Sequence, residues 1–129
     1  MARYETYGKV NVERALKVMF VMPSYLDYYP AISRKYKDFE FTDELTDAER
    51  LEEYASVYQQ FKKFVGSKMT VVLGMQENLY GLKSWIDDQI ERSDIYPKTR
   101  VDMVYNSLKI DWLKKVANQV HAIIEQNEN

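Results

Sequence analysis

The residues of this sequence that could do chemistry are few, and their spacing matches no common catalytic arrangement. The one histidine, His121, is followed four positions later by Glu125, so a helix would place both side chains on one face. Zinc sites need three or four protein ligands, and the chain has no cysteine to complete such a set. We therefore expect a partly exposed, structural histidine and no metal site.

Two pairs of adjacent carboxylates, Glu52–Glu53 and Asp87–Asp88, are the remaining candidates for acid–base chemistry. Adjacent side chains on a helix point about 100° apart and do not face each other, so we expect solvated surfaces. The four glycines form neither a P-loop nor a dinucleotide-binding fingerprint. These patterns predict no catalytic residue, no cofactor and a protein that is not an enzyme.

Tyrosine is unusually frequent, with 11 residues, six of them among the first 36. A tyrosine ring with its polar tip suits protein interfaces. The candidate protein-binding residues are the aromatic and basic side chains of one segment: Tyr25, Tyr28, Tyr29, Arg34, Lys35 and Tyr36. Either these rings cover the core, or they form a surface that binds a protein partner.

A second hypothesis places a nucleic-acid-binding element near the C-terminus. If the helical pattern after residue 97 breaks between Ser107 and Asp111, two helices and a turn would form a helix-turn-helix. The second helix would present side-chain types that contact phosphates and base edges: Lys114, Lys115, Asn118 and Gln119. Val104-Tyr105 and the run WLKKVA at 112–117 resemble the C-terminal part of late-transcription regulators of Gram-positive phages. The resemblance covers a small part of the chain and includes no diagnostic motif.

The chain has 129 residues and the composition of an ordinary folded protein. Its apolar residues, 46% of the total, can offset the entropy cost of folding when they are buried. The absence of cysteine excludes a disulfide scaffold. A net charge of −2 argues against a dedicated nucleic-acid coat, but the charge is uneven. Residues 1–37 hold seven basic and three acidic residues, whereas 38–60 hold one and eight. Either 38–60 is a solvated acidic linker, or the basic N-terminal part attracts an anionic partner.

No targeting or membrane-spanning segment is visible. The longest apolar run near the start, 18–22, has five residues, whereas a helix that spans a bilayer needs about 20. We therefore expect a cytoplasmic protein with no membrane partner.

The elements that must position these residues are helices, because apolar residues recur at helical spacing along most of the chain. We predict an all-α fold: a single compact domain, 1–129, of four to five helices in a bundle-like packing. Asn11 is expected to cap the first helix, which Pro23 ends. Ser24 is expected to cap a second helix that Pro30 either kinks or divides. An acidic loop is expected near 38–46.

The clearest helix start is a capping box, Thr46 with Glu49, before an apolar stripe that ends at Gly66. The central helix of the fold is expected near 67–92, with a short strand at 69–73 as the local alternative. It would carry Gly74 and Gly81 on one face, for close helix–helix approach or for a groove.

The last helical segment is expected to begin with Pro97 at its first position. Its apolar residues are near heptad spacing: Val101, Tyr105, Leu108, Trp112, Val116, Val120 and Ile123. This segment is either one long helix or two, and the stripe suits either burial within the chain or a homodimer seam. The tail, 125–129, is expected to be frayed.

These patterns together predict a small, non-enzymatic protein-interaction module. Cysteine-free helical chains of this size without a motif are often accessory or inhibitor proteins, including phage-encoded ones that bind a host or viral protein. The alternative is a DNA-binding transcription regulator that uses the C-terminal helix-turn-helix-like segment.

Overall fold

The computed structural model describes residues 12–21, 25–38 and 45–128, and every regular element in these ranges is a helix. Residues 12–17 are helical and continue into the 3-10 turn η1 (Val18–Phe20), which is followed by α2 (Tyr25–Asp38), α3 (Asp47–Gly74), α4 (Leu79–Ser93) and α5 (Arg100–Glu128). The prediction of an all-α bundle is confirmed. None of the helices in these ranges combines the length and the apolar character that crossing a membrane requires. The predicted caps Asn11 and Ser24, the stop at Pro23 and most of the acidic loop lie outside the described residues.

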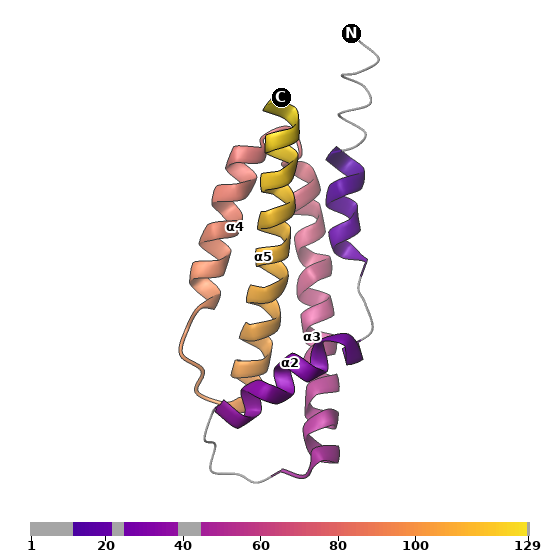
Figure 1. The fold of residues 1–129 in the computed structure, drawn as a ribbon, viewed down its shortest axis with the longest axis vertical. Helices are drawn as coiled ribbons and strands as arrows, with labels where there is room; N and C mark the ends of the chain where they lie inside the picture. Colours follow the sequence, from indigo (N-terminus) through magenta and orange to yellow (C-terminus); the bar gives the residue numbers. More distant parts are fainter. Residues whose placement is uncertain (1–11, 22–24, 39–44, 129) are drawn as a thin grey trace.

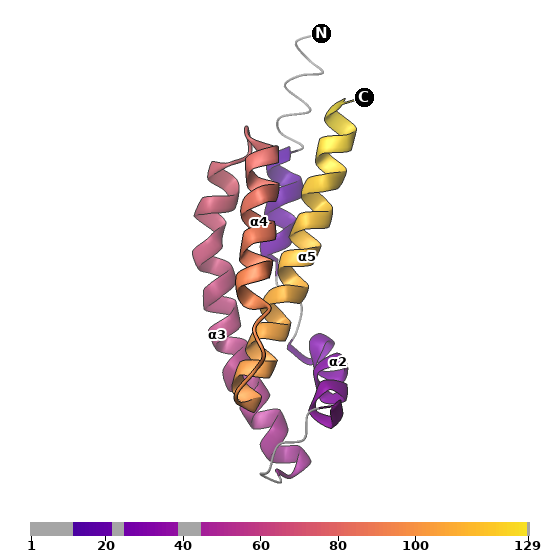
Figure 2. The same cartoon turned by 90° about the vertical axis from the view of Figure 1, so that its left-hand side faces the viewer.

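Three long helices run along the long axis of the molecule, with α4 antiparallel to α3 and α5, and α2 lies across them (Figures 1 and 2). The central helix is α5, which packs against both α3 and α4. It supplies nine of the twenty buried apolar residues of the described chain: Met103, Val104, Leu108, Trp112, Leu113, Val116, Val120, Ile123 and Ile124. The prediction of a central helix near 67–92 is therefore wrong.

The segment 67–92 is divided because the helix break lies after Gly74 rather than at Gly66. Helix α3 passes through Gly66, and Val65 and Val72 on either side of it are buried against the core. Burial of these neighbours outweighs the cost of about 1 kcal/mol that a glycine adds to a helix interior. A turn at 75–77 follows, and residues 69–73 are helical, so the strand alternative is also wrong.

The prediction of close helix–helix approach is wrong for Gly74, and the atoms nearest to Gly81 belong to its own turn. Gly74 is the last residue of α3, and a Cβ added there would meet no atom within 4 Å. Gly81 does have a close neighbour, but this neighbour is Asn78 in the same turn. The Asn78 Oδ1 accepts a hydrogen bond from the Gly81 N–H at 3.1 Å and caps α4.

The capping box at the start of α3 is confirmed. The Thr46 hydroxyl accepts a hydrogen bond from the Glu49 N–H at 3.2 Å, and Glu49 Oε1 accepts one from the Thr46 N–H at 3.1 Å. The hydrogen bond from the Thr46 backbone N–H, followed by the Thr46 side chain, lowers the pKa of the Glu49 carboxyl. Helix α2 is continuous with Pro30 inside it, which settles the question of a divided helix.

Helix α5 begins at Arg100, so the prediction of Pro97 as its first residue is wrong. The Thr99 hydroxyl instead accepts a hydrogen bond from the Asp102 N–H at 3.1 Å, as an N-terminal cap does. The helix continues to Glu128, through most of the tail for which we expected fraying. All residues of the predicted stripe from Leu108 onward are buried within the chain, whereas Val101 is exposed.

Candidate functional site

The two central tyrosines of the predicted protein-binding set hold α2 against α3. The Tyr28 ring lies 6.1 Å from Tyr58 and 6.3 Å from Phe61, and the Tyr29 ring lies 5.1 Å from Tyr54, measured between centroids. Both rings are partly buried against the core. Their packing matches the alternative in which these rings cover the core. The side chains of Tyr25 and Tyr36 lie outside the described part of the structure.

Lys115 joins the two predicted binding sets, which are far apart in sequence. Its Nζ lies 4.8 Å from the centroid of the Tyr28 ring, and it pairs with Asp111 at 3.4 Å. Arg34 and Lys35 on α2 and Lys114 on α5 are also exposed. We call the four cationic residues the basic face: Arg34, Lys35, Lys114 and Lys115.

The geometry needed for a C-terminal helix-turn-helix is absent, because residues 100–128 form one continuous helix. The expected turn at Ser107–Asp111 lies inside α5, where Leu108 is buried in the core. Lys114, Lys115 and Asn118 are exposed on the same helix, and Gln119 is half-buried. The prediction of a separate recognition helix is therefore wrong.

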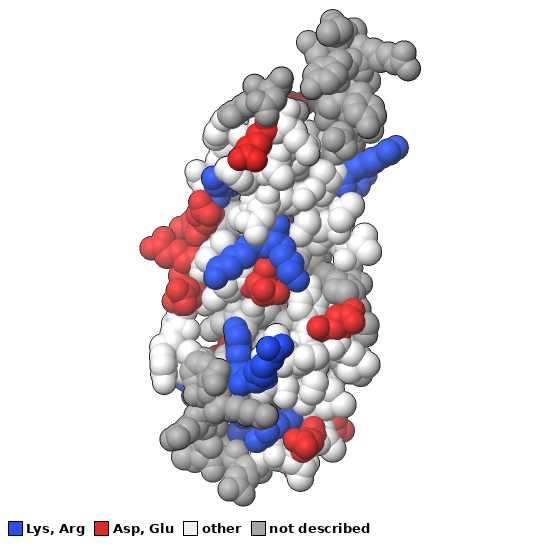
Figure 3. Space-filling model, in the orientation of Figure 1, with Lys and Arg blue, Asp and Glu red and all other residues white. Residues whose placement is uncertain are grey.

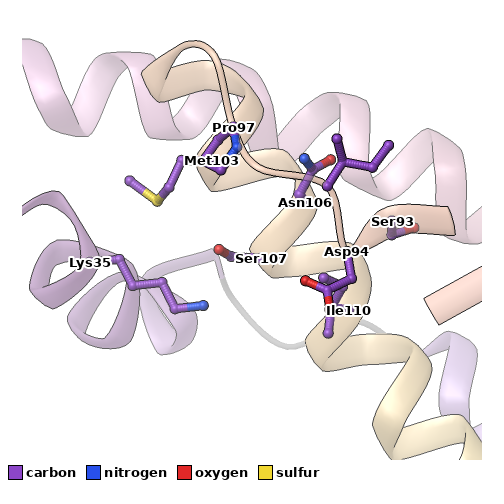
Figure 4. A pocket seen from close by; sticks show the side chains of 9 residues that line it. Lys35, Ser93, Asp94, Pro97, Met103, Asn106, Ser107 and Ile110 are labelled. Carbon is purple, nitrogen blue, oxygen red and sulfur yellow. The ribbon is translucent and has the colours of Figure 1, made fainter. Parts of the chain in front are cut away.

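An open pocket of about 280 Å³ lies next to the basic face (Figure 4). It is formed by α2, the end of α4, the α4–α5 connection and α5. Lys35 reaches from α2 toward the side where Ser93 and Asp94 lie. The lining combines apolar and hydrogen-bonding side chains: Lys35, Ser93, Asp94, Ile95, Pro97, Met103, Asn106, Ser107 and Ile110. Lys114 follows Ile110 by one helical turn, which places the basic face at the edge of the pocket.

The α4–α5 connection exposes large apolar surface at this pocket. Ile95 is 64% exposed and the adjacent Tyr96 is 82% exposed. Single exposed apolar residues are common, but two neighbouring ones beside a pocket form a contiguous patch of the kind that marks interaction sites.

Charge is unevenly distributed on this side of the molecule, although single acidic side chains also lie among the basic ones (Figure 3). Basic side chains gather over the middle of the view, where α5 and α2 lie, and acidic side chains gather at its left edge over α4. The exposed acidic residues of α4 include Asp87, Asp88 and Glu91. Among the described residues, the arrangement presents the positive charge of Lys35 at the pocket, where Asp94 is the one acidic lining residue, and a further group of acidic side chains on α4.

The pocket is lined neither by His121 and Glu125 nor by the two pairs of adjacent carboxylates. His121 is exposed and contacts Glu125 at 3.0 Å within the same helix. No group of three or more potential metal ligands occurs among the described residues. Glu53, expected to be solvated, instead forms a partly buried bidentate pair with Arg100.

No family model, curated protein or solved structure matches this chain. Its own surface must therefore carry the functional argument.

Most of the pocket was missed by reasoning from the sequence, which nominated only Lys35. The available signal was Ile95-Tyr96-Pro97, three bulky residues between two helical patterns. Apolar residues in a connection are either buried as anchors or left exposed, and the sequence alone does not separate these outcomes.

Proposed function

We propose that this protein is a non-enzymatic interaction module that binds an acidic segment of another protein at the basic face and its adjoining pocket. The observation that carries the proposal is the open pocket, which exposed Lys35 and exposed Ile95 line. Exposed Tyr96 follows Ile95 in the chain, and exposed Lys114 follows the lining residue Ile110 by one helical turn.

The pocket and its border have the two properties that such a partner would use. Buried aromatic and aliphatic anchors supply most of the affinity at protein interfaces, and Ile95 and Tyr96 are side chains of that type. Exposed cations around an interface mainly accelerate association and select the charge of the partner. An acidic segment with an apolar side chain would match both properties.

Tyr28 and Tyr29 have a supporting role in this proposal. They fix α2 on α3 and thereby hold Arg34 and Lys35 in place, so replacing them would test the fold rather than the interface. The direct contacts of the partner are expected at Lys35, Ile95, Tyr96 and Lys114.

The proposal is tested by capture on immobilised protein from a bacterial lysate, with and without nuclease treatment, followed by mass spectrometry. We expect a stoichiometric protein that is lost with the double variant Ile95→Asp and Tyr96→Ala. Tyr80→Ala is the matched control, because Tyr80 is 63% exposed on α4 and does not line the pocket. The control should retain capture, and circular dichroism should show all variants folded.

Two results would overturn the proposal. One is loss of capture that follows nuclease treatment rather than the pocket variants, which would favour the nucleic-acid alternative and Lys114, Lys115, Asn118 and Gln119. The other is equal capture by the pocket variant and the Tyr80→Ala control.

A further inference from the structure

A cluster of two lysines and three aromatic rings lies where α3, α4 and α5 meet. Lys68 Nζ on α3 is 5.2 Å from the centroid of the Phe64 ring and 5.8 Å from that of Trp85 on α4. Lys109 Nζ on α5 is 5.6 Å from the same Phe64 ring and 4.4 Å from Tyr105. Two ammonium groups from different helices therefore converge on one ring. We call these five residues the paired-lysine cluster.

Neither lysine of the cluster forms an ion pair with a carboxylate among the described residues. Lys17, Arg92, Arg100 and Lys115 each lie within 4 Å of a carboxylate, whereas neither Lys68 nor Lys109 does within that part of the chain. All five side chains of the cluster are half-buried, which weakens the screening by water.

The arrangement is unfavourable for the charges themselves. Partial burial, followed by the charge of Lys68, lowers the pKa of the Lys109 ammonium, and Asp102 only partly opposes this. Cation–π contacts with the aromatic rings offset part of the hydration free energy that the two ammonium groups lose on burial. They do not remove the repulsion between the two cations.

We propose that the paired-lysine cluster binds a small oxyanion, a phosphate or a carboxylate, that bridges the Lys68 and Lys109 ammonium groups. One oxyanion can accept a charge-assisted hydrogen bond from each lysine and neutralise the repulsion between them. The three rings would form the apolar floor and walls of the site, where water competes less for the same hydrogen bonds.

This site is separate from the pocket of the proposed function and does not depend on it. Lys109 and the pocket residue Ser107 are two positions apart on α5, which is about 200° around the helix. The pocket residue Asn106 is closer, about 60° around the helix from Lys109, but the pocket and the cluster share no residue, so each can fail in experiment without the other.

The test is a titration of the folded protein with inorganic phosphate at constant ionic strength, followed by NMR of the lysine side chains. In a second titration, acetate replaces phosphate. The anion with the lower dissociation constant is the preferred oxyanion. We expect saturable shifts at Lys68 and Lys109 and a higher pKa of Lys109 in the presence of the bound anion. The variants Lys68→Met and Lys109→Met should each weaken binding at least tenfold.

Lys63→Met is the matched control, because Lys63 is exposed on the same helix as Lys68 and should leave binding unchanged. Lys109→Arg retains the charge and should keep most of the affinity. The proposal is overturned if neither anion gives saturable shifts in the wild-type protein, or if the Lys63→Met variant loses as much affinity as Lys68→Met. The wild-type titration decides the matter even if a methionine variant fails to fold.

Discussion

The start of α4 shows how a single missing side chain allows a helix cap to form. A Cβ on Gly81 would lie 2.9 Å from Cγ of Asn78, the residue whose side chain caps this helix. Glycine leaves room for the asparagine to fold back over the first turn. Gly66, by contrast, is exposed within α3, and a Cβ there would meet no atom within 4 Å.

Substitution by alanine should therefore change the free energy of unfolding differently at the two glycines. Gly66→Ala should raise the free energy of unfolding by about 0.5–1 kcal/mol, because alanine restricts the unfolded chain and suits a helix interior. Gly81→Ala should give no such gain, because it displaces a cap worth about 1 kcal/mol. Urea denaturation measures both values. Equal stabilisation by the two substitutions would show that the Asn78 cap contributes nothing.

A second prediction at this scale concerns Tyr58, whose hydroxyl is held in the core. Burial, followed by the nearby Tyr28 and Asp27, raises the pKa of Tyr58 to about 12. An unfolded tyrosine loses its proton near pH 10, so above this pH the unfolded chain releases a proton that the fold retains. Stability linked to Tyr58 is thus complete below pH 10 and is lost as the pH rises toward 12.

Between about pH 9 and about pH 11, the wild-type protein should lose about 1 kcal/mol more stability than Tyr58→Phe. Denaturation at each pH gives the comparison, and Tyr80→Phe is the control because Tyr80 is exposed. Identical pH profiles for the wild type and Tyr58→Phe would show that the hydroxyl ionises as easily in the fold as in the unfolded chain.

Among the elements, α3 and α5 are joined by an ion pair that sequence spacing does not reveal. Arg100 Nε and Nη2 donate to the two carboxylate oxygens of Glu53 at 3.3 and 3.2 Å, across 47 positions of sequence. The two side chains are only 14% and 20% exposed. A bidentate pair of this kind requires the planar guanidinium, which lysine lacks.

Arg100→Lys should therefore lower the free energy of unfolding by about 1–3 kcal/mol, despite the unchanged charge. Glu13→Gln is the matched control: it removes the exposed Glu13–Lys17 pair on one helix and should cost less than about 0.5 kcal/mol. Thermal denaturation compares the two variants. A loss of similar size in both would mean that the Arg100 pair acts as an ordinary surface pair.

A helix boundary could be predicted from the sequence when neighbouring residues determine it. The capping box at Thr46 and Glu49 lies within four residues and was found from sequence. The passage of α3 through Gly66 was missed, because burial of Val65 and Val72 in the core of the bundle decides it. The start of α5 was misplaced for a different reason: Pro97 satisfies the rule for a first helical residue, but Thr99 supplies the cap.

On the scale of the whole molecule, the candidate site is assembled from segments that the sequence keeps apart. The basic residues of α2 and α5 were nominated separately, for different functions. They adjoin because Tyr28 packs on α3 while Lys115 covers the same ring. The sequence contained the residue types but not the placement of α2, which follows from packing between distant helices.

Within the described residues, the N-terminal segment 12–21 is attached to the bundle by a long-range hydrogen bond in addition to its buried Val12 and Leu16. The indole N–H of Trp112 donates to the carbonyl oxygen of Met19 at 2.8 Å, and the Trp112 and Phe20 rings meet edge to face at 5.7 Å. This bond spans 93 positions of sequence, so it forms only when α5 and the first helical segment are both in place.

Trp112→Phe keeps an aromatic ring in the core but removes the donor, which should cost about 1–3 kcal/mol. If the bond holds the segment, amide hydrogen exchange should accelerate in residues 12–20 and stay nearly unchanged in α4. Trp85→Phe is the control, because Trp85 is half-buried on α4 and contacts Lys68 rather than the N-terminal segment. Acceleration spread evenly over α3, α4 and α5 would instead mean that the substitution loosened the core. Unchanged protection at 12–20 would leave Leu16 and the Phe20 ring as the contacts that hold the segment in place.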